Sequence, residues 1–136
     1  MKHLLFLTIA LFSIQITLAQ GTEVVHEQVT DANSIYNSNF IEVKPQYPGG
    51  LQEFYKFIGK KYRVPNVKGL TGKVFISFVI EKDGSVTDLK VISDIGYGTG
   101  EEAVRVLKKC KKWIPAEQNG KKVRVEFTLP ISIQAP

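Results

Sequence analysis

The chain has 136 residues, a formal net charge of +5, one cysteine and two histidines. This length suits a single domain, and one cysteine can form neither an internal disulfide nor a zinc site. Both histidines precede residue 41, so the region expected to fold has no imidazole base or ligand, and we expect neither a metal nor a cofactor.

Residues 1–19 have the pattern of a targeting segment. Lys2 and His3 form a short basic start, and residues 4–18 are largely apolar. Thr17-Leu18-Ala19 places small residues where signal peptidase prefers them, and the apolar run is short for a membrane span. We expect cleavage before Gln20 and a periplasmic location, with an uncleaved inner-membrane anchor as the alternative.

Residues 20–42 are polar and predict a flexible lead-in, with a short strand near residues 40–43. Pro45, Pro48 and Gly49-Gly50 then interrupt the chain. Apolar residues at helical spacing predict a first helix over residues 51–62. The folded domain is expected to cover residues 43–136.

Three strand patterns and a second helix follow. Residues 72–81 are apolar on both faces, which is typical of a central strand, and Asp83-Gly84 predicts a tight turn into a second strand over residues 86–93. Residues 101–112 predict a helix with acidic residues at its start and lysines near its end. After the Asn119-Gly120 turn, residues 123–129 alternate as a half-buried strand, with Val123, Val125, Phe127 and Leu129 facing the core.

These elements predict an α+β fold. Its sheet has three antiparallel strands in the order 2-1-3, and two helices cover one face. The third strand is then an edge, and Pro130 disfavours a central position for its end. The expected core comprises Phe54, Ile58, Ile76, Phe78, Leu107, Trp113 and Phe127.

We find no catalytic motif in the sequence and predict that the protein is not an enzyme. Residues 96–100 follow a Gly-x-Gly-x-Gly spacing in an antiparallel context, which favours a flexible connection over a nucleotide loop. Cys110 lies on the apolar stripe of the second helix, which predicts a buried, small hydrophobic residue. A reactive or intermolecular thiol is the alternative. Tyr47, between two prolines, either packs under the first helix or contributes to a contact surface.

Positive charge is concentrated late in the chain. Residues 105–124 include eight basic residues and one acidic residue, Glu117. This region is either a solvated helix face and turn or a patch for anionic partners such as a membrane surface. Because we expect the chain to be exported, we predict no nucleic-acid partner.

Taken in order, the motifs resemble the C-terminal domain family of TonB, the energy transducer of the Gram-negative envelope. The matching features are Pro45-Gln46-Tyr47-Pro48, Gly72-Lys73-Val74, Asp83-Gly84-Ser85-Val86, the helix ending at Trp113, and Asn119-Gly120-Lys121 before the last strand. The Tyr47-Pro48-Gly49-Gly50 form resembles versions common in Bacteroidetes-type bacteria.

The resemblance implies a sheet with two helices and a function in binding. In the family, the last strand is an edge that accepts an extended segment, the TonB box, from the plug of an outer-membrane transporter. The protein-binding residues implied here are Gln46, Tyr47, Pro48, Val123, Arg124, Val125, Glu126, Phe127 and Thr128.

The chain departs from a full transducer in its N-terminal half. Its connection over residues 20–43 contains no proline and spans at most about 80 Å when fully extended. We therefore favour a periplasmic TonB-like module that binds transporters or other envelope proteins. A short membrane-anchored transducer and a small exported ligand-binding protein on the same fold remain the alternatives.

Overall fold

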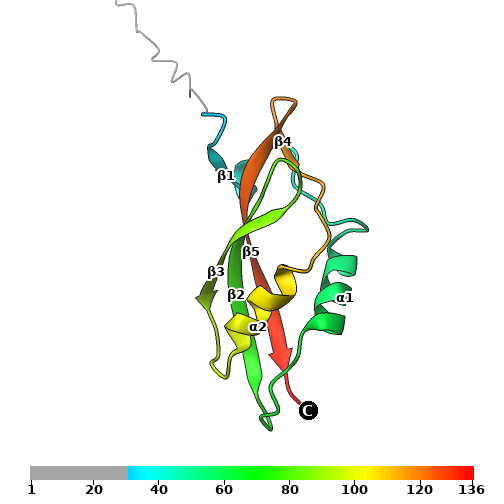
Figure 1. Ribbon diagram of the computed structural model, residues 1–136, viewed down its shortest axis with the longest axis vertical. Coiled ribbons are helices and arrows are strands. Elements are labelled where there is room, and N and C mark those ends of the chain that lie inside the picture. Colours follow the sequence, from blue (N-terminus) through cyan, green and yellow to red (C-terminus); the bar gives the residue numbers. More distant parts are fainter. Residues whose placement is uncertain (1–30) are drawn as a thin grey trace, which may run out of the picture.

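The computed structural model describes residues 31–136, so the predicted signal peptide and the first part of the lead-in lie outside the described residues. The order of elements is β1 (Ile35–Asn37), the 3-10 helix η1 (Ser38–Phe40), α1 (Leu51–Lys61), β2 (Thr71–Ile80), β3 (Val86–Ser93), α2 (Thr99–Leu107), β4 (Ala116–Gln118) and β5 (Lys121–Gln134). Figure 1 shows an elongated molecule built along the long strands β2 and β5.

The sheet has the order β1-β5-β2-β3, and β4 pairs with the start of β5. The three predicted strands correspond to β2, β3 and β5, and β2 lies between the other two with antiparallel pairing on both sides. The α+β class and the 2-1-3 order of these strands are confirmed. The long apolar run of β2 explains its central place, because both of its faces are buried over residues 76–80.

The lead-in adds a strand that the sequence did not indicate. β1 runs parallel to β5 and pairs Ile35 with Arg124, Tyr36 with Val125 and Asn37 with Glu126. The prediction that the last strand is an open edge is therefore wrong over residues 124–126. The short strand expected at residues 40–43 is reduced to an isolated bridge between Val43 and Glu117.

β5 is longer than predicted and runs through Pro130. Its pairing with β2 continues without a register shift from Val125 to Gln134. The inward alternation also continues, since Ile131 and Ile133 are buried like Leu129. A proline is tolerated here because its missing N–H falls on the side of β5 that faces away from β2.

Both helices pack on one face of the sheet, where a single core forms. α1 contributes Phe54 and Ile58, while α2 contributes Ala103, Val106 and Leu107. Six of the seven predicted core residues are buried, and Phe127 is half-buried. In Figure 1, α2 lies in front of β2, and α1 lies on the side of β5.

The second helix is shorter than predicted and begins two residues earlier. The hydroxyl of Thr99 donates to the carbonyl oxygen of Gly96 at 2.7 Å, and Thr99 is fully buried. Cys110 lies beyond the end of α2 and is half-buried, and this burial raises the pKa of its thiol. Between residues 31 and 136, no helix has the length and apolarity needed to cross a membrane.

Candidate functional site

The predicted binding strand, β5, has regular pairing with β2. β5 pairs with β2 in one unbroken register, whereas β3, the opposite edge, shows register shifts and a left-handed residue, Asp88, with a φ of 49°. Bulges of this kind twist an edge away from further pairing. A regular row of backbone groups is therefore found on β5.

The side chains of β5 alternate as predicted. Val125 and Leu129 are buried, Val123 and Phe127 are half-buried, and Glu126 and Thr128 are exposed together with Pro130, Ser132 and Gln134. Phe127 stacks against Phe78 and Trp113, with ring centroids 6.0 and 5.8 Å apart. Val123 pairs with Ala116 of β4.

The direction of the backbone groups of β5 follows from two contacts at its C-terminal half. The N–H of Ala135 donates to the carbonyl oxygen of Leu70, which precedes β2, at 2.8 Å. The carbonyl oxygen of Pro130 instead accepts from the hydroxyl of Tyr55 on α1, at 3.4 Å. In an unbroken antiparallel ladder the groups alternate, so odd-numbered residues bond to β2, and even-numbered residues turn their N–H and C=O outward.

Two of the outward residues are covered by β1, and one is open. Arg124 and Glu126 lie opposite β1, while Thr128 lies just past it. Val125, which the sequence placed among the binding residues, is directed toward β2 through its backbone and toward the core through its side chain. Its N–H therefore cannot be offered to a partner.

Arg124 does not project freely from the strand. Its guanidinium binds the carboxylate of Glu81 through Nε at 2.7 Å and Nη2 at 3.0 Å, and Nη1 donates to the carbonyl oxygen of Asn33 at 3.0 Å. The hydroxyl of Thr87 donates to the same carboxylate at 2.6 Å. The bond to Arg124 lowers the pKa of Glu81 and raises that of Arg124, so the pair stays ionised at neutral pH.

A groove of about 570 Å³ lies beside the edge at the point where β1 ends. Its lining brings the two predicted contact segments together, with Gln46 and Tyr47 on one side and Phe127 and Thr128 on the other. Lys44, Pro45, Leu51 and Trp113 complete the wall with residues of η1 and Gly50. The groove thus combines apolar and aromatic residues with polar ones, among them Lys44 and the amides of Asn39 and Gln46.

The Gln46-Tyr47-Pro48 segment is fixed by backbone and aromatic contacts. Gln46 forms a two-way backbone bridge with Ile114, with N–O distances of 3.0 and 2.7 Å. The ring of Tyr47 is buried and lies 5.2 Å from Phe54 and 5.3 Å from Trp113. The packing interpretation of Tyr47 is therefore correct for its ring, and only part of the residue faces the groove.

Pro48 does not line this groove. It lies instead in a smaller pocket of about 190 Å³, together with Lys111 and with residues of α1 that include Lys56 and Lys60. Gln46 is exposed and accessible from solvent. Of the three residues of this segment, Gln46 is thus the one best placed to contact a partner at the edge.

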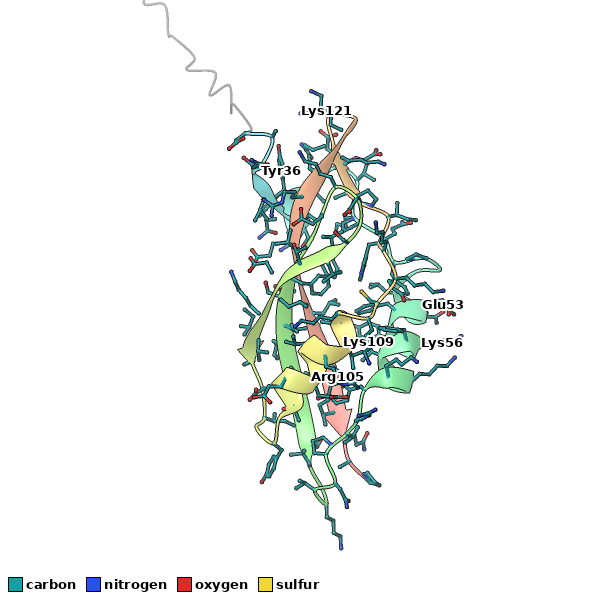
Figure 2. All side chains as sticks on the ribbon, viewed as in Figure 1. Tyr36, Glu53, Lys56, Arg105, Lys109 and Lys121 are labelled. Carbon is teal, nitrogen blue, oxygen red and sulfur yellow. The ribbon has the colours of Figure 1, made fainter. Side chains whose placement is uncertain are left out.

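The basic region is not one continuous patch. Lys109 lies near the end of α2, whereas Lys121 lies at the far tip of the molecule on the β4–β5 turn, as Figure 2 shows. Arg105 is paired with Glu102, and Arg124 with Glu81. The part of the chain that the structure describes contains no group of three His, Cys, Asp or Glu side chains that could hold a metal ion.

Sequence reasoning missed β1 and the groove. The groove has Leu51 and Trp113, which are distant in the sequence, in one lining, and periodicity alone does not reveal this. β1 is only three residues long, and the pair Ile35-Tyr36 within a polar stretch was its only signal.

The sequence model of the Gram-negative bacterial TonB protein C-terminal family matches residues 66–132. The chain therefore carries a domain of the TonB C-terminal family. Domains of this family take part in TonB-dependent transport in the cell envelope, interact with TonB-dependent transporters and are not enzymes.

The TonB-like chain is also similar to two solution structures of the C-terminal domain of Helicobacter pylori TonB. The first is 26% identical with a TM-score of 0.44, and the match covers 63% of this chain and 80% of that one. The second is 28% identical with a TM-score of 0.45, and the match covers 63% of this chain and 91% of that one. No curated protein sequence matches the chain.

Proposed function

We propose that this TonB-like domain works in the periplasm by binding an extended segment of a TonB-dependent outer-membrane transporter, or of another envelope protein. The segment adds as a strand to the outer edge of β5, and binding supports transport across the outer membrane. The observation that carries this proposal is the row of outward backbone groups at Arg124, Glu126 and Thr128, which ends beside the groove of Gln46 and Tyr47.

Backbone pairing and the groove have different roles in this proposal. Each main-chain hydrogen bond contributes only about 1 kcal/mol net, so a three- or four-residue ladder binds weakly and with little selectivity. Alternate side chains of the added strand point to the same face. A side chain opposite Phe127 therefore meets the aromatic and apolar groove wall, which favours a large apolar residue there.

The test replaces an outward residue by proline. Thr128→Pro removes a donor that is not bonded to β2 and places a ring against the incoming strand, so the domain should fold while peptide binding weakens about tenfold or more. Thr128→Ala keeps the donor and should change the Kd little. Affinity is measured by NMR titration with peptides copied from plug segments of the TonB-dependent transporters of the same genome.

Ser132→Pro is the matched control. Ser132 is exposed and outward like Thr128, but it lies beyond Pro130 and the groove. We expect this variant to bind like the original chain. If Thr128→Pro and Ser132→Pro both fold and both leave binding unchanged, strand addition beside the groove is refuted.

A further inference from the structure

β1 occupies part of the edge that an incoming strand would use. Ile35–Asn37 pairs with residues 124–126 in parallel, so the outward groups of Arg124 and Glu126 already face a strand. Of the outward residues Arg124, Glu126 and Thr128, only Thr128 is free of β1, and it also lines the groove. Figure 2 shows Tyr36 on β1 beside the upper part of β5.

The part of β5 beyond Thr128 offers a partner strand fewer backbone donors. Pro130 has no N–H, and its carbonyl oxygen accepts from the hydroxyl of Tyr55 on α1. The outward donors beyond Thr128 are therefore interrupted and resume only at Ser132. The longest continuous run of outward donors is the part that includes residues 124–128, which β1 covers in the free protein.

The contacts that hold β1 are few. The guanidinium of Arg124 donates to the carbonyl oxygen of Asn33, and the ammonium of Lys82 donates to that of Ala32. Tyr36 packs half-buried against the core, but residue Ile35 is 47% exposed and Asn37 is exposed. A three-residue parallel ladder with little apolar burial belongs to the least stable part of a structure, so β1 can leave without unfolding the domain.

We propose that β1 is an internal competitor for the binding edge. It covers residues 124–126 in the free protein and is displaced when a partner strand adds there. The inference rests on the proposed function, because it concerns regulation of the same edge. Its consequence is that the apparent Kd for a partner equals the intrinsic Kd divided by the fraction of molecules in which β1 is detached.

The first experiment locks β1 in place. Asn37 and Glu126 are register partners, and both are exposed, so the double variant Asn37→Cys and Glu126→Cys in a Cys110→Ala chain can form a disulfide across the pair. The same plug-derived peptides are titrated into the oxidised and the reduced form of this one protein. The oxidised form should bind at least about tenfold more weakly than the reduced form, because the disulfide removes the detached state that binding requires.

The second experiment detaches β1 and needs no ligand. Because Arg124 and Glu126 face outward, the parallel register turns the N–H of Tyr36 toward β5 and that of Ile35 away. Tyr36→Pro should therefore release β1, and Ile35→Pro is the matched control. Hydrogen exchange of the Arg124 and Glu126 amides should accelerate in Tyr36→Pro alone, and the Val125 amide, bonded to β2, should stay protected.

The outcomes separate the inference from the proposed function. Equal binding by the oxidised and reduced forms would overturn the inference and leave strand addition standing. Unchanged exchange of the Arg124 and Glu126 amides in a folded Tyr36→Pro variant would overturn it without reference to any ligand. Faster exchange combined with an absence of peptide binding in every form would refute strand addition itself, and the competitor role with it.

Discussion

Gly84, at the turn between β2 and β3, holds the wall of the groove in place. It is buried and has a φ of +86°, and a Cβ added there would overlap the carbonyl oxygen of Trp113. The N–H of Trp113 donates to the carbonyl oxygen of Gly84 at 2.8 Å. The turn thus touches the backbone of the residue whose ring lines the groove and stacks on Tyr47 and Phe127.

Gly84→Ala should destabilise the domain by about 3–6 kcal/mol. An L-residue in the left-handed region costs about 1–2 kcal/mol, overpacking against a fixed backbone costs about 1–3 kcal/mol, and the strained hydrogen bond adds about 1 kcal/mol. Each kcal/mol corresponds to a drop of about 4–8 °C in Tm for a domain of this size. The change is measured by urea and thermal denaturation followed by circular dichroism.

Gly120→Ala provides the control. Gly120 has a φ of +73°, but an added Cβ would meet nothing within 4 Å. This variant isolates the conformational cost and should lose only about 1–2 kcal/mol. If the two variants lose equal stability, the contact between the turn and Trp113 does not hold the fold together, and the reasoning is refuted.

Two further predictions concern pH and processing. The pKa of Glu81 lies below its ordinary value of 4.5, chiefly because of Arg124, so the stability that this carboxylate contributes is present above about pH 4.5 and is lost as the pH falls through the lower folded value. Glu81→Gln should therefore flatten the acid limb of a plot of urea midpoint against pH, and an unchanged slope would contradict this. Intact-mass analysis of periplasmic protein should show a chain that starts at Gln20; a full-length species in the inner membrane would instead favour an anchored transducer.

Local patterns predicted the hairpin, α1 and the central place of β2 because each is fixed by nearby residues. The turn at Asp83-Gly84 and the apolar alternation of β2 require no distant partner to be recognised. The predicted last strand, residues 123–129, is shorter than β5, which continues through Pro130 to Gln134. The proline is compatible with the strand only because its nitrogen faces the open side, which depends on the register with β2.

β1 could not be predicted in the same way because its position depends on distant residues. Three residues carry almost no periodic signal, and the segment is held by Arg124 of β5 and by Lys82 of the turn between β2 and β3. The groove has the same origin, since its walls come from η1, α1, β5 and the segment before α1. The sequence thus predicted the strand β5, whereas the cover that β1 provides over residues 124–126 depends on tertiary contacts.

An uncovered strand edge promotes aggregation, so β1 has a physical role in covering the edge of β5. The outward groups that can pair with a transporter segment can equally pair with a second copy of the chain, and regular unpaired edges promote aggregation. On β5, the exposed part beyond Thr128 is protected by Pro130 and by the hydroxyl of Tyr55, while residues 124–126 are protected by β1. Pro130 prevents strand pairing permanently, whereas the short parallel strand β1 can be displaced. A partner strand can therefore use the part of β5 that only β1 protects. This part lies beside the groove, which can select a side chain of the partner.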